Sequence, residues 1–267
     1  MKTLFHIQAD EQPGETKTLL LEVGADYCSY AFFSKADGSI TGLKYFSVDE
    51  FEMEADLRSI INEVKDLNFT EVLVCSAFPW ALLTPLKHAQ HSDALLEVIY
   101  DQPAQQHFSD AINEWQMVNA YSMPAAVFEL IQKQFPAARF IHAYTPAIKA
   151  YNGFAAENQI SVHFTTQHFR VLVKKGAQMQ LAQIYSYKTP LDVVYYLLKI
   201  CSEGQLDQSD VHLILSGLVE EASALYKELH HYFLHIHFAP APAVSLPQNE
   251  YPQHFFTSTY NLAACVS

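Results

Sequence analysis

Residues 18–46 read TLLLEVGADYCSYAFFSKADGSITGLKYF, and this stretch decides the fold. It contains three runs rich in apolar and aromatic residues: 18–23, 27–33 and 40–46. Turn signals separate these runs at Gly24-Ala25-Asp26 and at Ala36-Asp37-Gly38, where Asp-Gly accommodates positive φ. The stretch therefore predicts three sequential strands in an antiparallel meander, of which the first, entirely apolar over Leu19-Leu20-Leu21, is buried on both faces.

Helical and strand patterns follow the meander. Asp49 can cap a helix that runs to about Asp66, and residues 71–75 form an apolar strand. From about residue 78 to residue 123 the pattern loosens, with breaks at Phe78-Pro79-Trp80 and Leu83-Thr84-Pro85. We expect an inserted subdomain there. Regular patterns resume with a helix over 124–135, a strand over 138–143 and a helix over 146–154.

The first pattern then recurs. Strands are expected at 159–164, 169–174 and 179–187, followed by a helix at 189–202, a strand at 211–215, a helix at 219–232 and a strand at 234–238. The proline-rich tail after residue 239 is expected to be mostly irregular. The sequence thus predicts an α/β protein of two similar halves: residues 1–142, with the insertion at about 78–123, and residues 143–267.

Composition limits the classes of function. Half of the 267 residues are hydrophobic and 17% are charged, against about 25% in ordinary globular proteins, so a sizeable core is expected. The net charge of −13 makes nucleic-acid binding through a broad basic surface improbable. Without a signal-peptide pattern, or an apolar run near the ~20 residues of a membrane helix, we expect a cytoplasmic protein with no membrane insertion. The four cysteines form no C-x-x-C pair, which favours buried, reduced thiols.

Three short motifs carry a resemblance to a known family. They are Leu82-Leu83-Thr84-Pro85, Gln134-Phe135-Pro136-Ala137-Ala138 and His142-Ala143-Tyr144-Thr145-Pro146. Their spacing resembles an uncharacterised bacterial family of degenerate actin-like proteins (domain of unknown function 3822). The repeated unit is also similar to the actin-like ATPase (ribonuclease H-like) fold of actin, sugar kinases and Hsp70-type chaperones. More distantly, it resembles the actin-like scaffold proteins of type IV pilus and type II secretion assemblies, which hold a partner's peptide.

The resemblance implies two duplicated βββαβα-type halves with an inserted subdomain in the first, and ATP bound between the halves. In active members each meander begins with a strand that ends Asp-x-Gly, where the aspartate holds hydrated magnesium and the glycine lets backbone N–H groups approach phosphate. The first meander has Glu22-Val23-Gly24 there. Strands that end in Glu-x-Gly are common, however, so a strand-end glutamate beside a turn-forming glycine is the favoured interpretation of these residues. In the second meander an alignment by eye sets Val162 opposite Glu22 and Phe164 opposite Gly24, and neither residue suits a phosphate loop.

Two further groups of residues have alternative interpretations. The resemblance implies an adenosine motif of a strand followed by Gly-Gly, and Ser216-Gly217 after the strand 211–215 is either a half-preserved version or a plain strand-to-helix turn. The second group consists of four of the thirteen histidines, which cluster in the sequence: His230, His231, His235 and His237. His235-Ile236-His237 sets two imidazoles on one face of a strand, as zinc can use, but their alternation with apolar residues favours an ordinary half-buried strand and no metal.

The aromatic residues of the first meander also allow two interpretations. Most of them are expected in the core, and the alternative is an exposed docking surface. These residues are Tyr27, Tyr30, Phe32, Phe33, Tyr45 and Phe46.

The expected function is that of a non-catalytic actin-like scaffold for an unidentified protein or peptide, with no catalytic residues, no metal and no cofactor. Glu22, Gly24, Ser216 and Gly217 are the candidates for a degenerate nucleotide cleft. The alternative is a nucleotide-binding ATPase or phosphotransferase that uses ATP and magnesium through the same residues. A third possibility keeps ATP as a regulatory ligand without hydrolysis.

Overall fold

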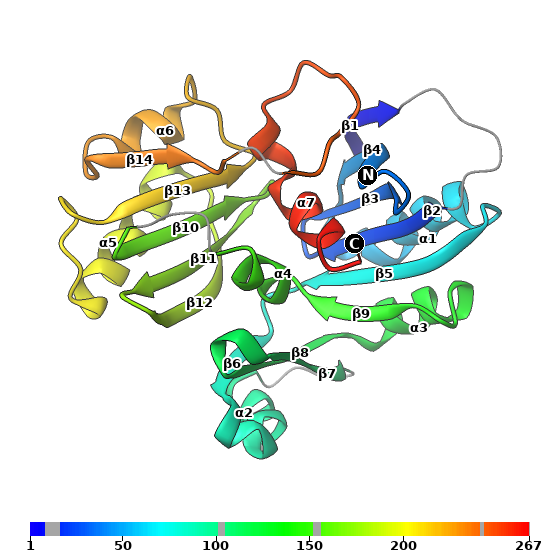
Figure 1. Ribbon diagram of the computed structural model, residues 1–267, viewed down its shortest axis with the longest axis horizontal. Helices are drawn as coiled ribbons and strands as arrows, with labels where there is room; N and C mark the ends of the chain where they lie inside the picture. The colour runs from blue at the N-terminus through cyan, green and yellow to red at the C-terminus, as the bar shows by residue number, and fades with distance from the viewer. Residues whose placement is uncertain (9–16, 101–104, 152–155, 241–242, 267) are drawn as a thin grey trace. The chain divides into compact units, whose positions relative to one another are not determined.

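The computed structural model describes residues 1–8, 17–100, 105–151, 156–240 and 243–266 (Figure 1). The chain forms two compact units. Unit 1 comprises Met1–Lys149, Ala243–Asn249 and Thr259–Ser267, and unit 2 comprises Ala150–Pro242 and Glu250–Ser258. Each unit has its own sheet and its own core, so each is described by itself.

Unit 1 is built on a six-stranded sheet of order β1-β4-β3-β2-β5-β9 (Figure 1). Its strands are β1 Lys2–Gln8, β2 Lys17–Gly24, β3 Tyr27–Ser34, β4 Ser39–Ser47, β5 Phe69–Ala77 and β9 Arg139–His142. Strands β2, β3 and β4 pair antiparallel, which confirms the predicted meander, and β5 and β9 continue the sheet in parallel. Strand β1, absent from the sequence-based expectation, pairs antiparallel with β4.

Two helices, α1 (Met53–Val64) and α3 (Ala125–Gln134), cover one face of this sheet. The Asp49 carboxylate accepts a hydrogen bond from the Phe51 backbone N–H, as an N-cap does, and a short 3₁₀ turn, η1 (Glu50–Glu52), leads into α1. Strand β2 contributes alternate residues, Leu19, Leu21 and Val23, to the core beneath the helices. The other face of β2 therefore carries Glu22 and Gly24.

The loosely patterned stretch after β5 forms a separate three-stranded sheet of order β6-β8-β7. Its elements are β6 Ala81–Pro85, η2 Leu86–His91, α2 Ser92–Ile99, β7 Gln105–Ile112, η3 Asn113–Trp115 and β8 Met117–Pro124. After β9 the chain enters α4 (Tyr144–Lys149), which begins two residues before the expected Pro146. The end of that expected helix, residues 152–154, lies outside the described residues.

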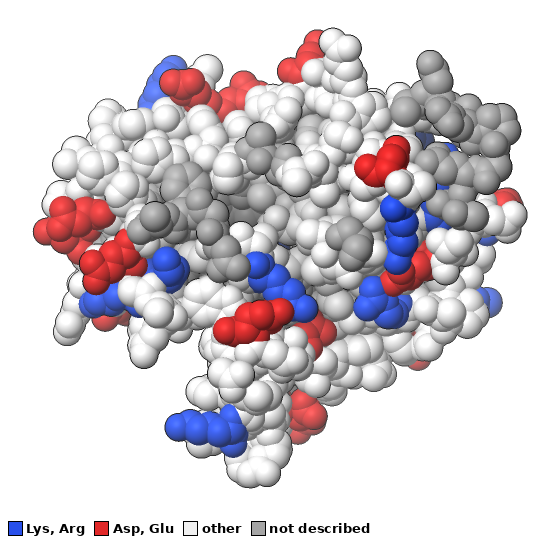
Figure 2. Space-filling view, in the orientation of Figure 1, with Lys and Arg blue, Asp and Glu red and all other residues white. Residues whose placement is uncertain are grey.

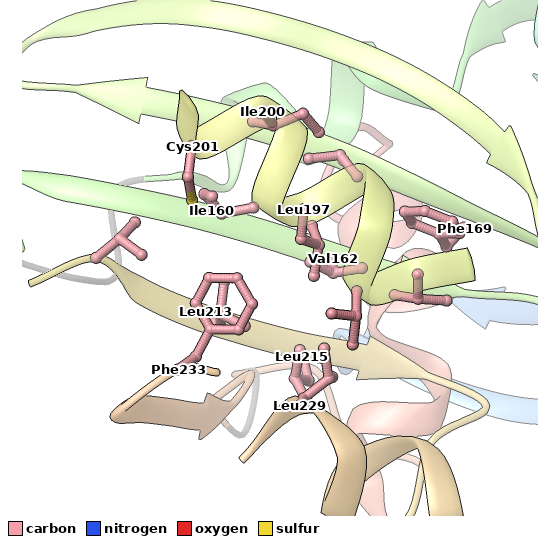
Figure 3. Close-up of a cluster of buried hydrophobic side chains, with 14 of the residues drawn as sticks. Ile160, Val162, Phe169, Leu197, Ile200, Cys201, Leu213, Leu215, Leu229 and Phe233 are labelled. Atoms are coloured by element: carbon pink, nitrogen blue, oxygen red, sulfur yellow. The ribbon is translucent and has the colours of Figure 1, made fainter. Parts of the chain in front are cut away.

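Unit 2 repeats the meander, helix and strand around a five-stranded sheet of order β12-β11-β10-β13-β14. Its elements are β10 Asn158–Phe164, β11 His168–Lys175, β12 Gln178–Ser186, α5 Pro190–Gly204, β13 His212–Gly217, α6 Ala224–Leu229 and β14 His235–Phe238. The helix expected at 189–202 is α5, and Thr189 closes a capping box with Asp192 at its start. Leucine, isoleucine and valine side chains from β10, β13 and α5 interlock in the core (Figure 3).

The expectation of a mostly irregular tail is wrong for its last part. Residues 253–263 form η5 (Gln253–Phe256) and α7 (Thr257–Ala263). Phe256, Tyr260 and Leu262 are all buried, so packing against the rest of the protein orders the segment that follows the last proline of the tail, Pro252.

Three expectations from composition can be compared with the structure. No helix in the described ranges is both long and apolar enough to cross a membrane. On the face in Figure 2, basic side chains are scattered among acidic ones and form no broad positive patch. All four cysteines are free thiols, and Cys28, Cys75 and Cys201 are buried.

Candidate functional site

Glu22 lies near the end of β2, between Ser29 on β3 and Cys75 on β5. Its side chain is buried, with 2% of the residue exposed. The Tyr27 hydroxyl donates a hydrogen bond of 2.7 Å to Glu22 Oε1. The carboxylate that the sequence singles out for magnesium is therefore engaged by a neighbouring tyrosine.

Gly24 is covered by the same tyrosine. A Cβ atom on Gly24 would lie 2.6 Å from Tyr27 Cε1 and 3.4 Å from the Ala77 Cβ, closer than real side chains approach in the first case. The Tyr27 ring stacks on Tyr45, with centroids 5.2 Å apart and planes 5° apart, and both rings are buried. We call Glu22, Gly24, Tyr27 and Tyr45 the Tyr27 site. The Tyr27 ring lies against the Gly24 backbone, so any larger residue at position 24 would collide with the ring.

The structure corrects the alignment of the second meander. Val162 and Phe164 belong to the core under α5 and α6, as Leu21 and Val23 belong to the core of unit 1. A slip of one residue along a strand exchanges its two faces, and the alignment by eye contained such a slip.

The hairpin spacing gives the corrected match. The last β10–β11 pair, Phe164 with Phe169, is separated by four residues, as is the last β2–β3 pair, Val23 with Cys28. The residue equivalent to Glu22 is therefore His163, and the residue equivalent to Gly24 is Thr165.

His163 lies between Arg170 on β11 and Ser216 on β13, and all three residues are buried. His163 Nδ1 lies 3.0 Å from Ser216 Oγ, within hydrogen-bond distance. Two hydrogen bonds join the ends of the turn between β10 and β11: the Thr165 hydroxyl donates to the His168 carbonyl and accepts from the His168 backbone N–H. At these positions unit 2 offers an imidazole and a β-branched residue, where unit 1 offers a carboxylate and a glycine.

Gly217 ends β13 with φ of +74°, in the left-handed region that favours glycine. A Cβ at this position would lie 2.0 Å from the Phe164 carbonyl oxygen and 2.8 Å from the Phe164 nitrogen. The Phe164 carbonyl also accepts a hydrogen bond from the Leu218 N–H at 2.9 Å. Close packing of two backbones accounts for this glycine without any ligand.

The four candidate residues thus form two separate pairs. Glu22 and Gly24 belong to unit 1, where Tyr27 joins them, and Ser216 and Gly217 belong to unit 2, where they contact His163 and Phe164.

The histidine cluster gains a member that the sequence analysis missed. His212 on β13 pairs with His235 on β14, and their rings stack with centroids 4.7 Å apart. His212 Nδ1 also lies 3.2 Å from His237 Nε2. Burial lowers the pKa of His212, and the neighbouring His235 and His237 lower it further. Cross-strand pairing, which cannot be read from spacing along one strand, brings His212 to this group.

The other two histidines do not join this group. The His230 ring packs on Tyr226, and His231 Nδ1 lies 3.7 Å from Glu228. Within the described ranges, no group of three or more histidine, cysteine, aspartate or glutamate side chains is arranged to hold a metal ion.

A second buried polar group in unit 1 was also missed. Asp110 on β7 accepts hydrogen bonds from the His142 backbone N–H at 2.8 Å and from the Thr145 hydroxyl at 2.6 Å. The His142 ring lies 2.9 Å from the Phe78 carbonyl through Nε2 and accepts the Tyr144 N–H at Nδ1, so Nε2 carries the proton. We call these residues the Asp110 cluster. It ties the inserted sheet to the junction of β9 and α4.

Burial decides between the two interpretations of the first-meander aromatics. Tyr27, Tyr30, Phe33, Tyr45 and Phe46 are each less than 7% exposed, so the core interpretation is confirmed for them. Phe32 is partly buried and packs against the same core. The alternative of an exposed docking surface on this meander is wrong.

Comparison with known proteins agrees with this fold. The model of the family described as "Protein of unknown function (DUF3822)" matches residues 8–236. A protein of Bacteroides thetaiotaomicron, with actin-like ATPase fold and unknown function, superposes with a TM-score of 0.80 at 16% identity, covering 94% of this chain and 96% of the other. No curated protein matches the sequence.

Two further solved structures are similar in fold. The PilM–PilN type IV pilus biogenesis complex gives a TM-score of 0.61 at 10% identity, over 94% of this chain and 98% of the other. The ethanolamine utilization protein EutJ from Carboxydothermus hydrogenoformans gives a TM-score of 0.53 at 9% identity, over 96% of this chain and 92% of the other. At such identities the similarity establishes the actin-like ATPase fold alone.

Proposed function

This chain belongs to the DUF3822 family and has the actin-like ATPase fold, and from that premise we propose that it is a non-catalytic scaffold that binds a protein or peptide. The observation that carries the proposal is the Tyr27 site. There a buried tyrosine covers Gly24 and hydrogen-bonds Glu22, which are the residues that a phosphate loop would need to expose.

The energetics of the Tyr27 site support this proposal. For Glu22 to hold hydrated magnesium, the 2.7 Å hydrogen bond to Tyr27 would have to break, and a hydrogen bond to a charged group contributes about 1.5–3 kcal/mol. For phosphate to approach the Gly24 backbone, the Tyr27 ring would also have to leave its stack on Tyr45. The residues present at this site therefore do not fit magnesium–ATP.

Unit 2 supports the same proposal independently. His163 and Thr165 stand where a second phosphate loop would need a carboxylate and a glycine. An imidazole is a poor ligand for the hard magnesium ion, which prefers oxygen. A β-branched residue keeps phosphate from the close backbone approach that glycine allows.

A protein or peptide partner is the kind of ligand that this fold can hold without nucleotide. The structurally similar PilM occurs in a complex with PilN, which makes the fold a precedent for partner binding by analogy. The net charge of −13 disfavours nucleic acid as the ligand. A partner captured from native extract should form a complex with purified protein that survives size-exclusion chromatography; if no captured protein does so, this half of the proposal fails.

We expect the purified protein to release no phosphate from magnesium–ATP or magnesium–GTP above a protein-free blank. The measurement is a continuous phosphate assay, run in parallel on the wild type and on Glu22→Gln. The substitution keeps the shape of the side chain and removes its charge. Phosphate release by the wild type that Glu22→Gln abolishes would contradict the proposal and support the alternative.

That alternative is a nucleotide-binding ATPase or phosphotransferase. One observation favours it: Glu22 and Gly24 lie at the end of β2, with a carboxylate two residues before a glycine. It requires Tyr27 to move when nucleotide binds. ATP as a regulatory ligand without hydrolysis requires the same movement.

A further inference from the structure

The five strands of unit 2 contain no aspartate or glutamate, although the chain has 29 acidic residues. The charged side chains of this sheet are Arg170, Lys174 and Lys175 on β11, and five histidines accompany them on β10, β11, β13 and β14. Charges farther away than about 10 Å are largely screened at ordinary ionic strength. The sheet of unit 2 is therefore locally free of negative charge in a chain whose net charge is −13.

Arg170 is the buried one of the three arginines in the chain. Only 7% of Arg170 is exposed, whereas Arg58 and Arg139 are exposed and Arg139 pairs with Glu71. Within the described ranges, the Arg170 guanidinium forms no hydrogen bond, ion pair or ring contact. A guanidinium stays charged in proteins, and a buried charge without a partner destabilises the fold. An anion bound at Arg170 would therefore stabilise the folded protein.

Arg170 lies in a polar row with His163 and Ser216, on the adjacent strands β11, β10 and β13. Because side chains alternate along a strand, this row lies on the face of the sheet opposite to the core residues Val162 and Leu215. Strands β10 and β13 are parallel, and the row crosses each of them one residue before its end. It therefore lies near the carboxyl ends of these strands, where open α/β sheets bind ligands.

We propose that Arg170 binds a carboxylate group of the protein or peptide partner, a proposal that rests on the scaffold function proposed above. The planar guanidinium presents parallel N–H donors that match the two oxygens of a carboxylate. Its single positive charge balances the single negative charge of that group. With 7% of Arg170 exposed, only a small group reaches it, such as the tip of an acidic side chain or the carboxyl terminus of a chain.

Phosphate is the other oxyanion that a guanidinium fits, and the backbone beside the row disfavours it. Phosphate sites use several free backbone N–H groups in a loop or at a helix N-terminus. Here the Thr165 N–H donates to the His168 carbonyl, and the His168 N–H donates to the Thr165 hydroxyl. The Leu218 N–H donates to the Phe164 carbonyl. These backbone donors are already engaged, which leaves the side chain of Arg170 as the anchor and favours a carboxylate.

The test is a nuclear magnetic resonance titration of the full-length wild type, labelled with nitrogen-15 in arginine. Three arginines give three Nε–H signals, and Arg58→Lys and Arg139→Lys assign the Arg170 signal by elimination. Sodium acetate is the carboxylate probe, and sodium chloride and sodium phosphate are run at equal ionic strength. Acetate should shift the Arg170 signal in a saturable way, with a Kd of about 10–100 mM, and should leave the signal of the exposed Arg58 in place.

Three outcomes would overturn the proposal. They are an Arg170 signal that acetate shifts no more than chloride does, a shift without saturation that the Arg58 signal shares, and a saturable shift with phosphate but none with acetate. The titration involves no nucleotide, so its failure leaves the scaffold function standing. Saturable binding of magnesium–ATP in calorimetry would instead remove the scaffold function, whatever acetate does.

A matched pair of variants gives a second, independent readout. Arg170→Met removes the buried charge and keeps a long side chain, and Arg58→Met removes an exposed arginine. A ligand that binds only the folded state stabilises it, so acetate should raise the urea midpoint of the wild type and of Arg58→Met above the value in chloride. Arg170→Met should show less of this rise. A rise of the same size in Arg170→Met would contradict the assignment of the site to Arg170.

Discussion

Replacing Gly217 with alanine is expected to destabilise the protein by about 3 kcal/mol or more, since a left-handed residue costs about 1–2 kcal/mol and overpacking a further 1–3 kcal/mol. The new Cβ would lie 2.0 Å from the Phe164 carbonyl oxygen. That oxygen belongs to the backbone of β10, which pairs with β11 on one side and β13 on the other, so it cannot move aside. The measurement is urea unfolding followed by far-ultraviolet circular dichroism.

Gly176→Ala is the matched control for this substitution. Gly176 also has a positive φ, +59°, but an added Cβ would meet nothing within 4 Å. The control therefore measures the conformational cost alone, and the excess loss in Gly217→Ala measures the contact with Phe164. If the two variants lost the same stability, close packing would not be the reason for Gly217, and a ligand role for this glycine would regain support.

The second large effect is a pH dependence that originates at Asp110. Burial raises the pKa of Asp110 to about 6 in the folded protein, although the Thr145 hydroxyl, the His142 N–H and the charge of Lys149 oppose the shift. The unfolded chain releases this proton near its ordinary pKa of 3.8. Between these values the folded state binds more protons than the unfolded state, so stability falls as the pH rises. A difference of about 2 pKa units corresponds to about 3 kcal/mol.

Asp110→Asn should remove this component. As the pH rises from 4 to 7, the free energy of unfolding of the variant should fall less than that of the wild type, by up to about 3 kcal/mol. The measurement is urea unfolding at each pH. Asp207→Asn provides the control, because hydrogen bonds from Ser209 lower the pKa of the exposed Asp207 carboxyl below its ordinary value of 3.8. Its contribution to stability therefore changes mainly below pH 4, and between pH 4 and pH 7 the profile of this variant should run parallel to that of the wild type. Parallel pH profiles for the wild type and Asp110→Asn would show that Asp110 does not titrate in this range.

Local signals in the sequence were sufficient to predict the two meanders. The Asp37-Gly38 turn and the apolar runs around it are local features, and the structure has strands where they predict them. The alignment of β10 with β2 was wrong by one residue, which exchanged the two faces of β10. Strand β10 is buried on both faces over much of its length, so its sequence shows no alternation of apolar and polar residues from which to set the register. Only the packing of Val162 and Phe164 under α5 and α6 identifies His163 as the match for Glu22.

The features that the sequence did not predict depend on contacts between distant residues. The His142–Thr145 motif supports the family resemblance, but its buried partner Asp110 lies 32 positions before His142, in a stretch without periodicity. His212 meets His237 only because β13 and β14 are neighbours. The sequence predicts Tyr27 only as one of several core aromatics. Its contact with Gly24 depends on the ring orientation, which spacing along the chain does not give.

Calorimetric titration of the purified protein with magnesium–ATP tests the central claim most directly, because it requires neither turnover nor a known partner. If Tyr27 covers Gly24 and engages Glu22, the titration should give no saturable heat at about 100 µM protein, with or without magnesium. Saturable binding with a Kd below about 1 µM that is lost when magnesium is removed would contradict the claim and make this chain a nucleotide-binding protein.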